Sequence, residues 1–326
     1  MVRFIVRRLL WMIPTLLIVT FLVFVAIRVG TNPVAAYLRL NPRASPEKVA
    51  QFKHVNGLEG SIPNQYFSWL RRFLTWDWPR SIAGNRPVWP NLKDALANSF
   101  VLGGLATVVG IGIGLVVGIL AALRQYSKFD TAASTSAFVG ISIPPYVSAV
   151  LLQLLFAVYF TRWLGLHHPF LPTSGVYPPG HRGFDIILRL KHLILPTIVV
   201  AIQIIAIYTR YMRASLLDVI SSDYLRTARA KGISERRVIV SHALRNALIP
   251  IVTVATIDIA GIVGGLIITE GVFEYPGAGK FFLNAYTAGD FPSLMPWMVI
   301  VVVFVVLFNL LADVLYAWLD PRIRLE

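Results

Sequence analysis

The 326-residue sequence contains no cysteine and few charged residues. The absence of cysteine excludes disulfides, thiolate metal sites and a cysteine nucleophile, although it leaves the redox compartment open. Only 14 % of the residues are charged, whereas a soluble chain usually carries about a quarter. With 56 % apolar residues and a mean hydropathy of +0.67, the composition is typical of a lipid-embedded protein.

Acidic residues are scarce as well, with 16 Asp and Glu against 30 Lys and Arg, so that the net charge is +14. In a soluble chain this charge would suggest nucleic acid as a partner. In an apolar chain the simpler interpretation is that cationic loops orient membrane spans and contact anionic lipid. Basic charge alone is non-specific, and we therefore expect no nucleic-acid partner.

Six apolar runs are candidates to cross a bilayer, which requires about 20 predominantly apolar residues. The first run follows three arginines, but it is long and no small-residue cleavage site follows it, so we expect a retained span and no signal peptide. The sequence predicts an all-α integral membrane protein with a long loop or small domain after the first span. The expected spans are 9–27, 100–123, 132–160, 193–208, 251–269 and 295–317.

Six spans place both termini on one side of the membrane, and the distribution of Lys and Arg indicates which side. The side of the termini carries 15 Lys and Arg, and the other side carries 15, of which ten lie in 28–97. Long loops count poorly, so the short-loop balance is 15 against 5 and the termini are expected to be cytoplasmic. The expected domains are 1–28, an extracytoplasmic 29–97, a core 98–320 and a cytoplasmic tail 321–326.

Two features interrupt the apolar pattern inside the spans. Gly110, Gly114 and Gly118 repeat at four-residue spacing, which suits close helix packing or, alternatively, a face that slides during transport. The sequence 143–146, Ile-Pro-Pro-Tyr, is expected to break the third span near its middle. Broken helices in membranes are tolerated where they contact protein or water, so Pro144 is a candidate for a substrate pathway.

The segment from Asp223 to Pro250 is strongly basic, yet it lies between two apolar spans. Ser222 or Asp223 can cap a helix start, Gly232 suits the left-handed position after a helix end, and Ser234 can cap a second helix. The sequence predicts a hairpin of helix, Gly turn and helix on the cytoplasmic side, with Pro250 opening the next span.

A hairpin that only lies on lipid is the simpler interpretation of this segment. Small residues just before the glycine favour instead a knob seated in the cleft of a partner. These residues are Thr227, Ala228 and Ala230.

The same segment carries a specific resemblance. Its Arg226-Thr227-Ala228-x-x-x-Gly232, ending in Leu248-Ile249-Pro250, resembles the coupling loop of ABC-importer membrane subunits. Arg226 stands where the family pattern has Glu, a departure that is usual in the oligopeptide and dipeptide permease branch. The chain resembles the first, B-type, permease of the pair in that branch, although 29–97 matches poorly. Further matching motifs are Arg7-Arg8-Leu9-Leu10, His192-Leu193-Ile194-Leu195-Pro196, Arg210-x-x-Arg213-Ala214-Ser215, Glu270 to Gly279, Asn309-x-x-x-Asp313-x-x-Tyr316 and Leu319-Asp320-Pro321-Arg322.

The resemblance implies a non-catalytic subunit of an ATP-driven importer in the bacterial inner membrane. Such a subunit forms half of a peptide pathway with a second permease, two cytoplasmic ATPase subunits drive it, and an extracytoplasmic binding protein delivers the peptide. ATP and Mg²⁺ are then held by the ATPases, and no cofactor by this chain. The residues expected to dock into an ATPase are Tyr224, Arg226, Thr227, Ala228, Ala230, Lys231, Gly232, Ser234 and Arg237.

Ionisable residues inside spans are costly and usually functional. Asp258 lies within the fifth expected span, where its carboxylate could meet a peptide amine in the pathway or bond to the partner permease. Glu270, at the outer end of that span, is a second candidate for the substrate pathway. Asp313 lies near the inner end of the sixth span and is expected to cap or pair there.

Other function classes fit the sequence less well. An ion-gradient transporter, the main alternative, would show paired intramembrane charges and inverted repeats, which the sequence lacks. An intramembrane hydrolase would need a Ser/His or metal motif inside the spans. The segment from Glu274 to Phe281 resembles a phosphate loop, but it lacks the Gly and the Ser or Thr that the loop needs at these two positions. The histidines have no partners at metal-ligand spacing, so no metal is expected.

Overall fold

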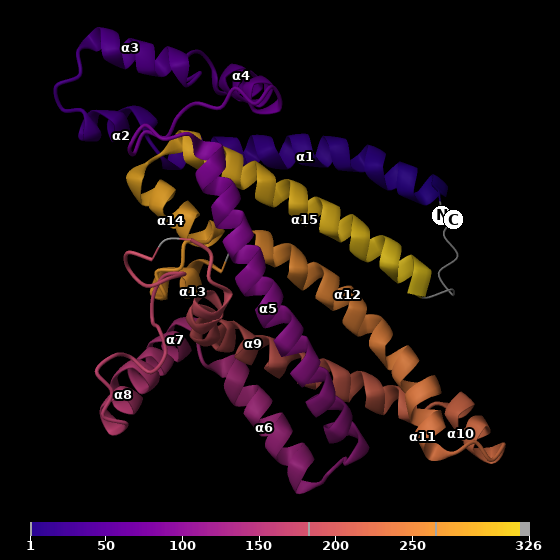
Figure 1. The fold of residues 1–326 in the computed structure, drawn as a ribbon. Coiled ribbons are helices and arrows are strands. Elements are labelled where there is room, and N and C mark those ends of the chain that lie inside the picture. The colour runs from indigo at the N-terminus through magenta and orange to yellow at the C-terminus, as the bar shows by residue number, and fades with distance from the viewer. Residues whose placement is uncertain (1, 182, 265, 320–326) are drawn as a thin grey trace. The chain divides into compact units, whose positions relative to one another are not determined.

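The computed structural model describes residues 2–181, 183–264 and 266–319, and every regular element in these ranges is a helix (Figure 1). Six helical segments are long and apolar enough to cross a membrane, which confirms the predicted all-α fold with six spans. They are Val6–Gly30, Val88–Leu123, Pro145–Trp163, Ile186–Ile220, Glu235–Ile262 and Phe291–Leu315. The predicted tail, 321–326, and the motif from Asp320 to Arg322 lie outside the described residues.

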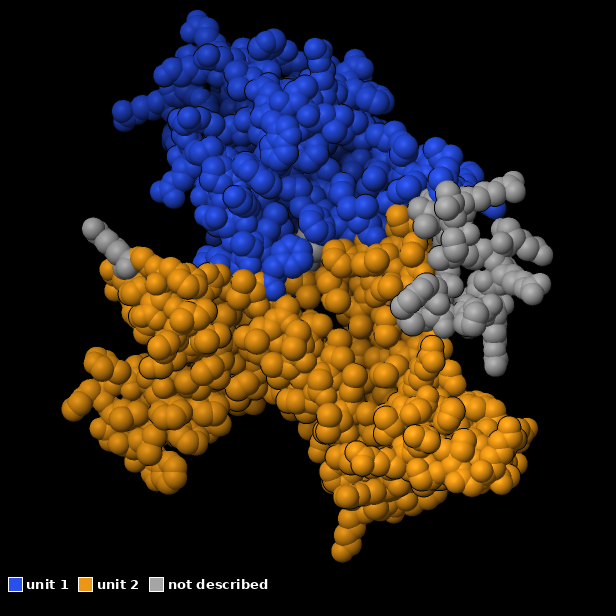
Figure 2. All heavy atoms as spheres, turned by 45° about the vertical axis from the view of Figure 1, so that its right-hand side comes forward, with its two compact units in different colours: residues 1–100, 263–267, 276–307 blue, residues 101–262, 268–275, 308–326 orange. Residues whose placement is uncertain are grey.

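The chain divides into two compact units, coloured separately in Figure 2. Unit 1 comprises 1–100, 263–267 and 276–307, and unit 2 comprises 101–262, 268–275 and 308–326. The region after the first span therefore belongs to one unit with the first span itself and with most of the sixth.

Unit 1 combines the long helix α1 (Val2–Gly30) with three short helices in the predicted loop, α2 (Pro33–Leu40), α3 (Pro46–Val55) and α4 (Ile62–Leu74). Two of the short helices begin with a polar cap followed by proline: the Asn32 side chain accepts from the N–H of Ala35, and that of Ser45 accepts from Lys48. Proline suits the first helical position because its missing N–H has no helical partner there. The same unit contains the start of α5 (Val88–Leu123), α14 (Ala278–Ala288) and most of α15 (Phe291–Leu319).

An aromatic cluster holds unit 1 together. Phe24 of α1 is 1 % exposed, and its ring centroid lies 5.6 Å from those of Tyr66 and Phe291 and 6.1 Å from that of Trp69. The hydroxyls of Thr20 and Tyr66 share a hydrogen bond of 2.8 Å. Edge-to-face aromatic pairs add about 0.5–1.5 kcal/mol to the burial of their area. The cluster thus fixes α4 on α1 and on the start of α15.

Unit 2 is organised around α9 (Ile186–Ile220), against which α6 (Lys128–Ser142) and α7 (Pro145–Gln153) pack. A π-helical turn, η1 (Leu154–Tyr159), and α8 (Phe160–Trp163) continue α7. The unit also contains α10 (Asp223–Ala230), α11 (Glu235–Arg237), the π-helical η2 (Val238–Ala243), α12 (Leu244–Val263) and most of α13 (Ile267–Val272).

The glycine repeat of α5 lies against α9. A Cβ at Gly114 would lie 2.9 Å from the Cβ of Tyr208, and a Cβ at Gly118 would lie 2.7 Å from the carbonyl oxygen of Thr209. Any side chain larger than hydrogen would push the two helices apart at these positions. The contacts support the packing interpretation of the glycine spacing.

The predicted helix break at 143–146 is confirmed, because α6 ends at Ser142 and α7 begins at Pro145. Its predicted place in the middle of the third span is wrong, because the candidate span, Pro145–Trp163, begins at the break. Pro144 has no N–H, so the carbonyl of Gly140 has no helical donor four residues later. Gln203 of α9 supplies one: its Nε2 lies 2.8 Å from the oxygen of Gly140 and 2.9 Å from that of Ile143. One side chain therefore satisfies the end of α6 just before the candidate span begins.

The prediction that Pro250 opens the fifth span is wrong. The helical segment begins at Glu235 and runs through Pro250, so the second arm of the basic hairpin is the start of the span itself. Ala247 and Ile251, on either side of the proline, are both buried in one apolar cluster. Their packing stabilises the continuous helix although Pro250 has no N–H to donate. The fifth span also ends earlier than 269, since α12 stops at Val263.

Candidate functional site

The basic hairpin consists of α10, a turn at Gly232, α11 and η2, and it continues into α12 (Figure 1). Leu225 of α10 and Val238 of η2 are fully buried. They pack in one cluster with Met212 and Leu216 of α9 and with Ala243. Burying a Leu or Val side chain contributes about 1.5–3 kcal/mol. The hairpin is therefore seated on the protein itself by both arms, which a ribbon held only by lipid would not require.

The turn has the geometry that its glycine predicts. Gly232 has a φ of +77°, in the left-handed region, and follows the C-cap residue Lys231. The N–H of Gly232 donates to the oxygen of Arg229 at 2.9 Å, and the N–H of Ile233 donates to that of Ala228 at 3.4 Å. These two bonds form a Schellman motif. No atom lies within 4 Å of a Cβ built at Gly232, so the backbone conformation, and not lack of space, favours glycine here.

Polar contacts fix the two arms relative to each other. Two of the Arg229 side-chain nitrogens, Nε and Nη2, each donate to a carboxylate oxygen of Glu235 at 3.0 Å across the turn. Asn246 Nδ2 donates to the hydroxyl of Tyr224 at 2.7 Å. Ser222 and Ser234 occupy the two predicted cap positions, but neither side chain makes a cap hydrogen bond. The Ser222 hydroxyl instead donates to the oxygen of Val219 at 2.6 Å.

Eight of the nine predicted docking residues are exposed on this hairpin. The exception is Ala228, which is partly buried and packs against the cluster of Leu225 and Val238. The small exposed residues at the end of α10 and in the turn after it are therefore Ala230 and Gly232. We call the exposed set the hairpin surface: Tyr224, Arg226, Thr227, Ala230, Lys231, Gly232, Ser234 and Arg237.

The structure places the three predicted pathway residues on different elements. Asp258 is exposed on α12, and its Oδ2 accepts a hydrogen bond of 2.8 Å from the hydroxyl of Tyr208. A carboxylate exposed within a span needs a polar neighbour beyond this chain or water in a pathway. Pro144 is also exposed, at the break before α7, whereas Glu270 of α13 is 0 % exposed.

An ion pair that was not predicted from the sequence joins the buried Asp130 of α6 to the partly buried Arg213 of α9. Arg213 Nε lies 2.5 Å from Oδ1 and Nη2 lies 2.8 Å from Oδ2, while the N–H of Tyr126 donates to Oδ2 at 2.9 Å. The hydrogen bonds from Arg213 lower the pKa of Asp130 to about 2. Arg213 belongs to a quoted motif and Asp130 lies in the short polar segment between two expected spans, but 83 residues separate the two, so only the fold could pair them.

Two family models match the chain and together cover most of it. Residues 114–325 match the binding-protein-dependent transport system inner membrane component, and residues 1–99 match the N-terminal region of the corresponding membrane component. The first match contains the hairpin and α12, and the second contains α1 to α4.

Curated relatives match over the whole length. The chain is 37 % identical to the oligopeptide transport system permease protein AppB of Bacillus subtilis, covering 99 % of this chain and 100 % of the relative. It is 32 % identical to the dipeptide transport system permease protein DppB of Escherichia coli K12, covering 99 % of both chains.

A solved structure shows the same fold. The match is to an inward-facing conformation of the MetNI methionine ABC transporter, with a TM-score of 0.55 at 18 % identity, covering 72 % of this chain and 98 % of that one. Together with the six candidate spans, the family matches make this a multi-pass protein of the bacterial inner membrane. The chain belongs to the family of binding-protein-dependent transport system inner membrane components.

Proposed function

We propose that this chain is the membrane-spanning permease subunit of an ATP-driven peptide importer and forms half of its pathway. Family membership supports the importer, and the names of the curated relatives, oligopeptide and dipeptide permeases, support peptides as the substrate class. The chain binds no cofactor in this account, because ATP and Mg²⁺ belong to separate ATPase subunits. A second, homologous permease completes the pathway, and an extracytoplasmic binding protein delivers the peptide.

The observation that carries the proposal is the hairpin surface. Leu225 and Val238 pack the hairpin against α9 and α12. Ala230, with its methyl group, and Gly232, which has no side chain, are exposed. A rigid end with small residues can enter a cleft on another protein, and the exposed arginines around it can pair with acidic residues there. We assign the hairpin surface as the ATPase-docking site.

The seating of the hairpin explains how docking could drive transport. The second arm of the hairpin is continuous with α12, and its cluster includes Met212 and Leu216 of α9. A displacement of the docked hairpin would therefore act directly on two spans. In free-energy terms, ATP bound by the ATPases and peptide delivered from outside would each favour one state of a two-state bundle.

The topology follows from the same assignment. An ATPase is cytoplasmic, so the hairpin and both termini are assigned to the cytoplasm, in agreement with the short-loop balance of 15 against 5 Lys and Arg. Residues 29–97 then lie outside the membrane on the opposite side, and 98–320 form the transport core. Within that core Asp258 is the stronger pathway candidate, because its carboxylate is exposed whereas Glu270 is buried.

Purification of the tagged chain from its native membrane in mild detergent tests the proposal. The expected result is a complex with a second permease and one or two phosphate-loop ATPases. After reconstitution, the complex should take up a labelled peptide only with ATP and a binding protein. A lone, monodisperse chain whose transport follows an ion gradient would contradict the proposal and favour a secondary transporter.

A further inference from the structure

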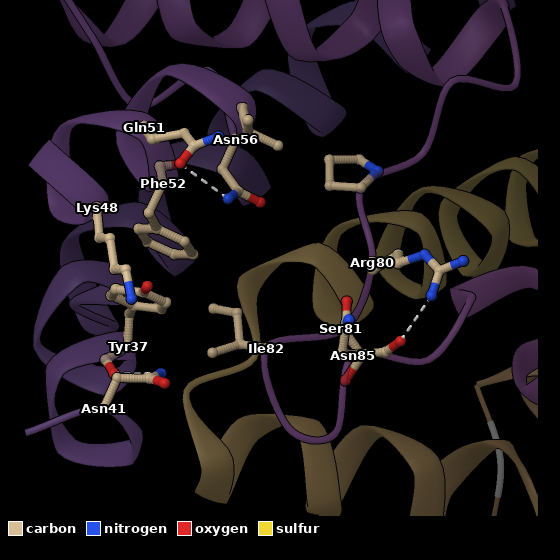
Figure 3. Close-up of a pocket in the computed structure, with 12 residues that line it drawn as sticks. Tyr37, Asn41, Lys48, Gln51, Phe52, Asn56, Arg80, Ser81, Ile82 and Asn85 are labelled. Carbon is tan, nitrogen blue, oxygen red and sulfur yellow. Dashed lines mark hydrogen bonds between the residues drawn. The ribbon is translucent and has the colours of Figure 1, made fainter. Parts of the chain in front are cut away.

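A groove of about 680 Å³ lies in unit 1, in the region proposed to be extracytoplasmic (Figure 3). One wall comes from α2 and α3 and includes Tyr37 and Phe52, whose rings stack with centroids 4.3 Å apart. The other wall is the loop 79–85, from which Ile82 points toward the helices. The groove thus lies between two separate pieces of chain, each of which contributes apolar side chains.

The rim of this groove is cationic. Lys48 lines the groove and also an adjoining hollow of about 350 Å³ that Arg43 borders. Arg80 borders the groove from the loop, with its Nη1 3.1 Å from the oxygen of Asn85. Neither lining contains an Asp or Glu, as far as the described residues show. Residues 28–97 as a whole carry ten Lys and Arg against four Asp and Glu, so the region attracts acidic partners.

One buried acceptor in the groove has no donor. The Oδ1 of Asn56 is inaccessible to solvent and has no hydrogen-bond partner among the described residues, while its Nδ2 donates to the oxygen of Phe52 at 2.9 Å. Figure 3 shows the Asn56 side chain in the space between α3 and the loop. This oxygen is closed to solvent, so it offers no contact to an occupant, and recognition in the groove rests on its cationic rim and its apolar side chains.

Both walls are anchored to the corner where α14 meets α15. Asp290, which is 3 % exposed, accepts from the N–H of Ile82 at 3.0 Å and from the hydroxyl of Ser81, and it also accepts from Ser293 at the start of α15. On the other wall, Arg39 Nη2 donates to the oxygen of Ala288 at 3.1 Å. The groove is therefore held open by fixed contacts, and its walls are tied to the start of a membrane span.

We infer that this groove docks an acidic, extended segment of the extracytoplasmic binding protein. The inference rests on the proposed function, which supplies the partner. An extended acidic chain offers apolar side chains for the ring stack and carboxylates for Lys48 and Arg43. A free peptide would gain little here, because a single ion pair at a surface contributes little binding free energy. A folded partner adds area around the groove and benefits from charge-steered association.

Charge reversal with a matched control tests the docking groove. The full importer complex is placed in nanodiscs, and the purified peptide-loaded binding protein of the same system is titrated while ATP hydrolysis is followed. The Arg43→Glu/Lys48→Glu variant should raise the half-maximal binding-protein concentration at least tenfold. The control, Lys53→Glu/Arg86→Glu, carries the same charge change on exposed residues outside the groove and should shift that concentration less than twofold.

A second variant removes the dependence on charge. Ile82→Trp fills the groove, and it should weaken stimulation as the charge reversal does, with the assembled complex checked by size-exclusion chromatography. A photoreactive phenylalanine at Gln51, which lines the groove, should label an acidic segment of the binding protein.

The outcomes separate the two proposals. If the binding protein stimulates the wild-type complex and both groove variants equally, only the docking groove is wrong. Equal shifts for the groove variant and its control would also overturn it, as general electrostatics would then suffice. Labelling of the groove by a free photoreactive peptide without binding protein would assign it to substrate instead. A wild-type complex that no binding protein stimulates would contradict the proposed function itself.

Discussion

Arg213 holds the carboxylate of Asp130 in two parallel hydrogen bonds, of 2.5 Å from Nε and 2.8 Å from Nη2. Asp130 is buried near the start of α6, and Arg213 lies in the C-terminal half of α9. The pair therefore joins two helices of unit 2. Bidentate pairs of this kind are stronger than ordinary hydrogen bonds. This contact gives α6 a defined position on α9.

Replacing Asp130 with Asn should destabilise the folded chain by about 1.5–3 kcal/mol, the range for hydrogen bonds to charged groups. The reason is that Arg213 keeps its charge but loses its partner. Thermal unfolding in nanodiscs at pH 7 measures the effect. Asp218→Asn is the control, because Asp218 is exposed on α9, the helix that carries Arg213. Equal melting temperatures for Asp130→Asn and wild type would contradict the role of the pair.

The same pair predicts a pH dependence. The pKa of Asp130 is lowered from 3.8 to about 2 in the folded chain, so its stabilisation is fully present above pH 4 and is lost as the pH falls from 4 toward 2. The difference in stability between wild type and Asp130→Asn should therefore shrink over this interval. Unfolding measured in nanodiscs from pH 2 to pH 6 checks this, and a constant difference would show that Asp130 does not titrate as described.

Two glycines of α5 should respond to alanine in opposite directions. Gly118→Ala places a methyl group 2.7 Å from the backbone oxygen of Thr209, and such overpacking typically costs about 1–3 kcal/mol. Gly112→Ala meets nothing within 4 Å and should be neutral or stabilising by up to about 1 kcal/mol, because alanine favours helix. Unfolding of the two variants in the same nanodiscs is the measurement. Equal effects would contradict the close packing of α5 on α9.

Gln203→Leu should loosen the break between α6 and α7. The variant leaves the oxygens of Gly140 and Ile143 without the donor that Nε2 provides, at a cost of about 1–3 kcal/mol. Amide hydrogen exchange over 139–148 should accelerate. Ser142→Ala serves as the control, since the hydroxyl of Ser142 donates to the oxygen of Phe138 within its own helix. Unchanged exchange in Gln203→Leu would mean that the break is held by other contacts.

Leu225→Ala tests the seat of the hairpin. Leu225 is fully buried, and removal of such a side chain typically costs 2–5 kcal/mol. Limited proteolysis of 223–237 should therefore become faster, and ATP hydrolysis by the complex should become less dependent on peptide delivery. Val240→Ala is the matched control because Val240 is 57 % exposed on the second arm. The account of the seat fails if the two variants are cleaved at the same rate.

Apolar length predicts the spans but not their full extent. The helix expected at 100–123 begins at Val88, and the one expected at 193–208 covers Ile186–Ile220. Hydropathy detects the part of a helix that fits in lipid, whereas the helix continues through polar residues such as Lys93. The break at Pro144 and the left-handed Gly232 were predictable because a missing N–H and a positive φ are local properties.

Side chains that act across the fold were not predictable. In the sequence Gln203 is one polar residue in an apolar run, and its partners are identified only when α6 lies beside α9. In the same way, Asp130 and Arg213 contact each other only because α6 and α9 pack together. The fifth span was wrongly predicted to begin at Pro250. The burial of Ala247 and Ile251 outweighs the tendency of the proline to interrupt a helix. Eight of the nine residues predicted on the hairpin are exposed, as their polarity or small size suggests. Ala228 is instead partly buried, because it packs against the apolar cluster.

Cross-linking from the hairpin tests the central claim most directly. The chain has no cysteine, so Ala230→Cys carries a unique thiol to which a maleimide benzophenone can be attached in native membranes. Irradiation should link Ala230→Cys to a phosphate-loop ATPase subunit, identified by mass spectrometry. Ser241→Cys, exposed on η2 outside the hairpin surface, should give little of this product. No ATPase adduct from Ala230→Cys, or equal adducts from both positions, would contradict the assignment of the hairpin as the ATPase-docking site.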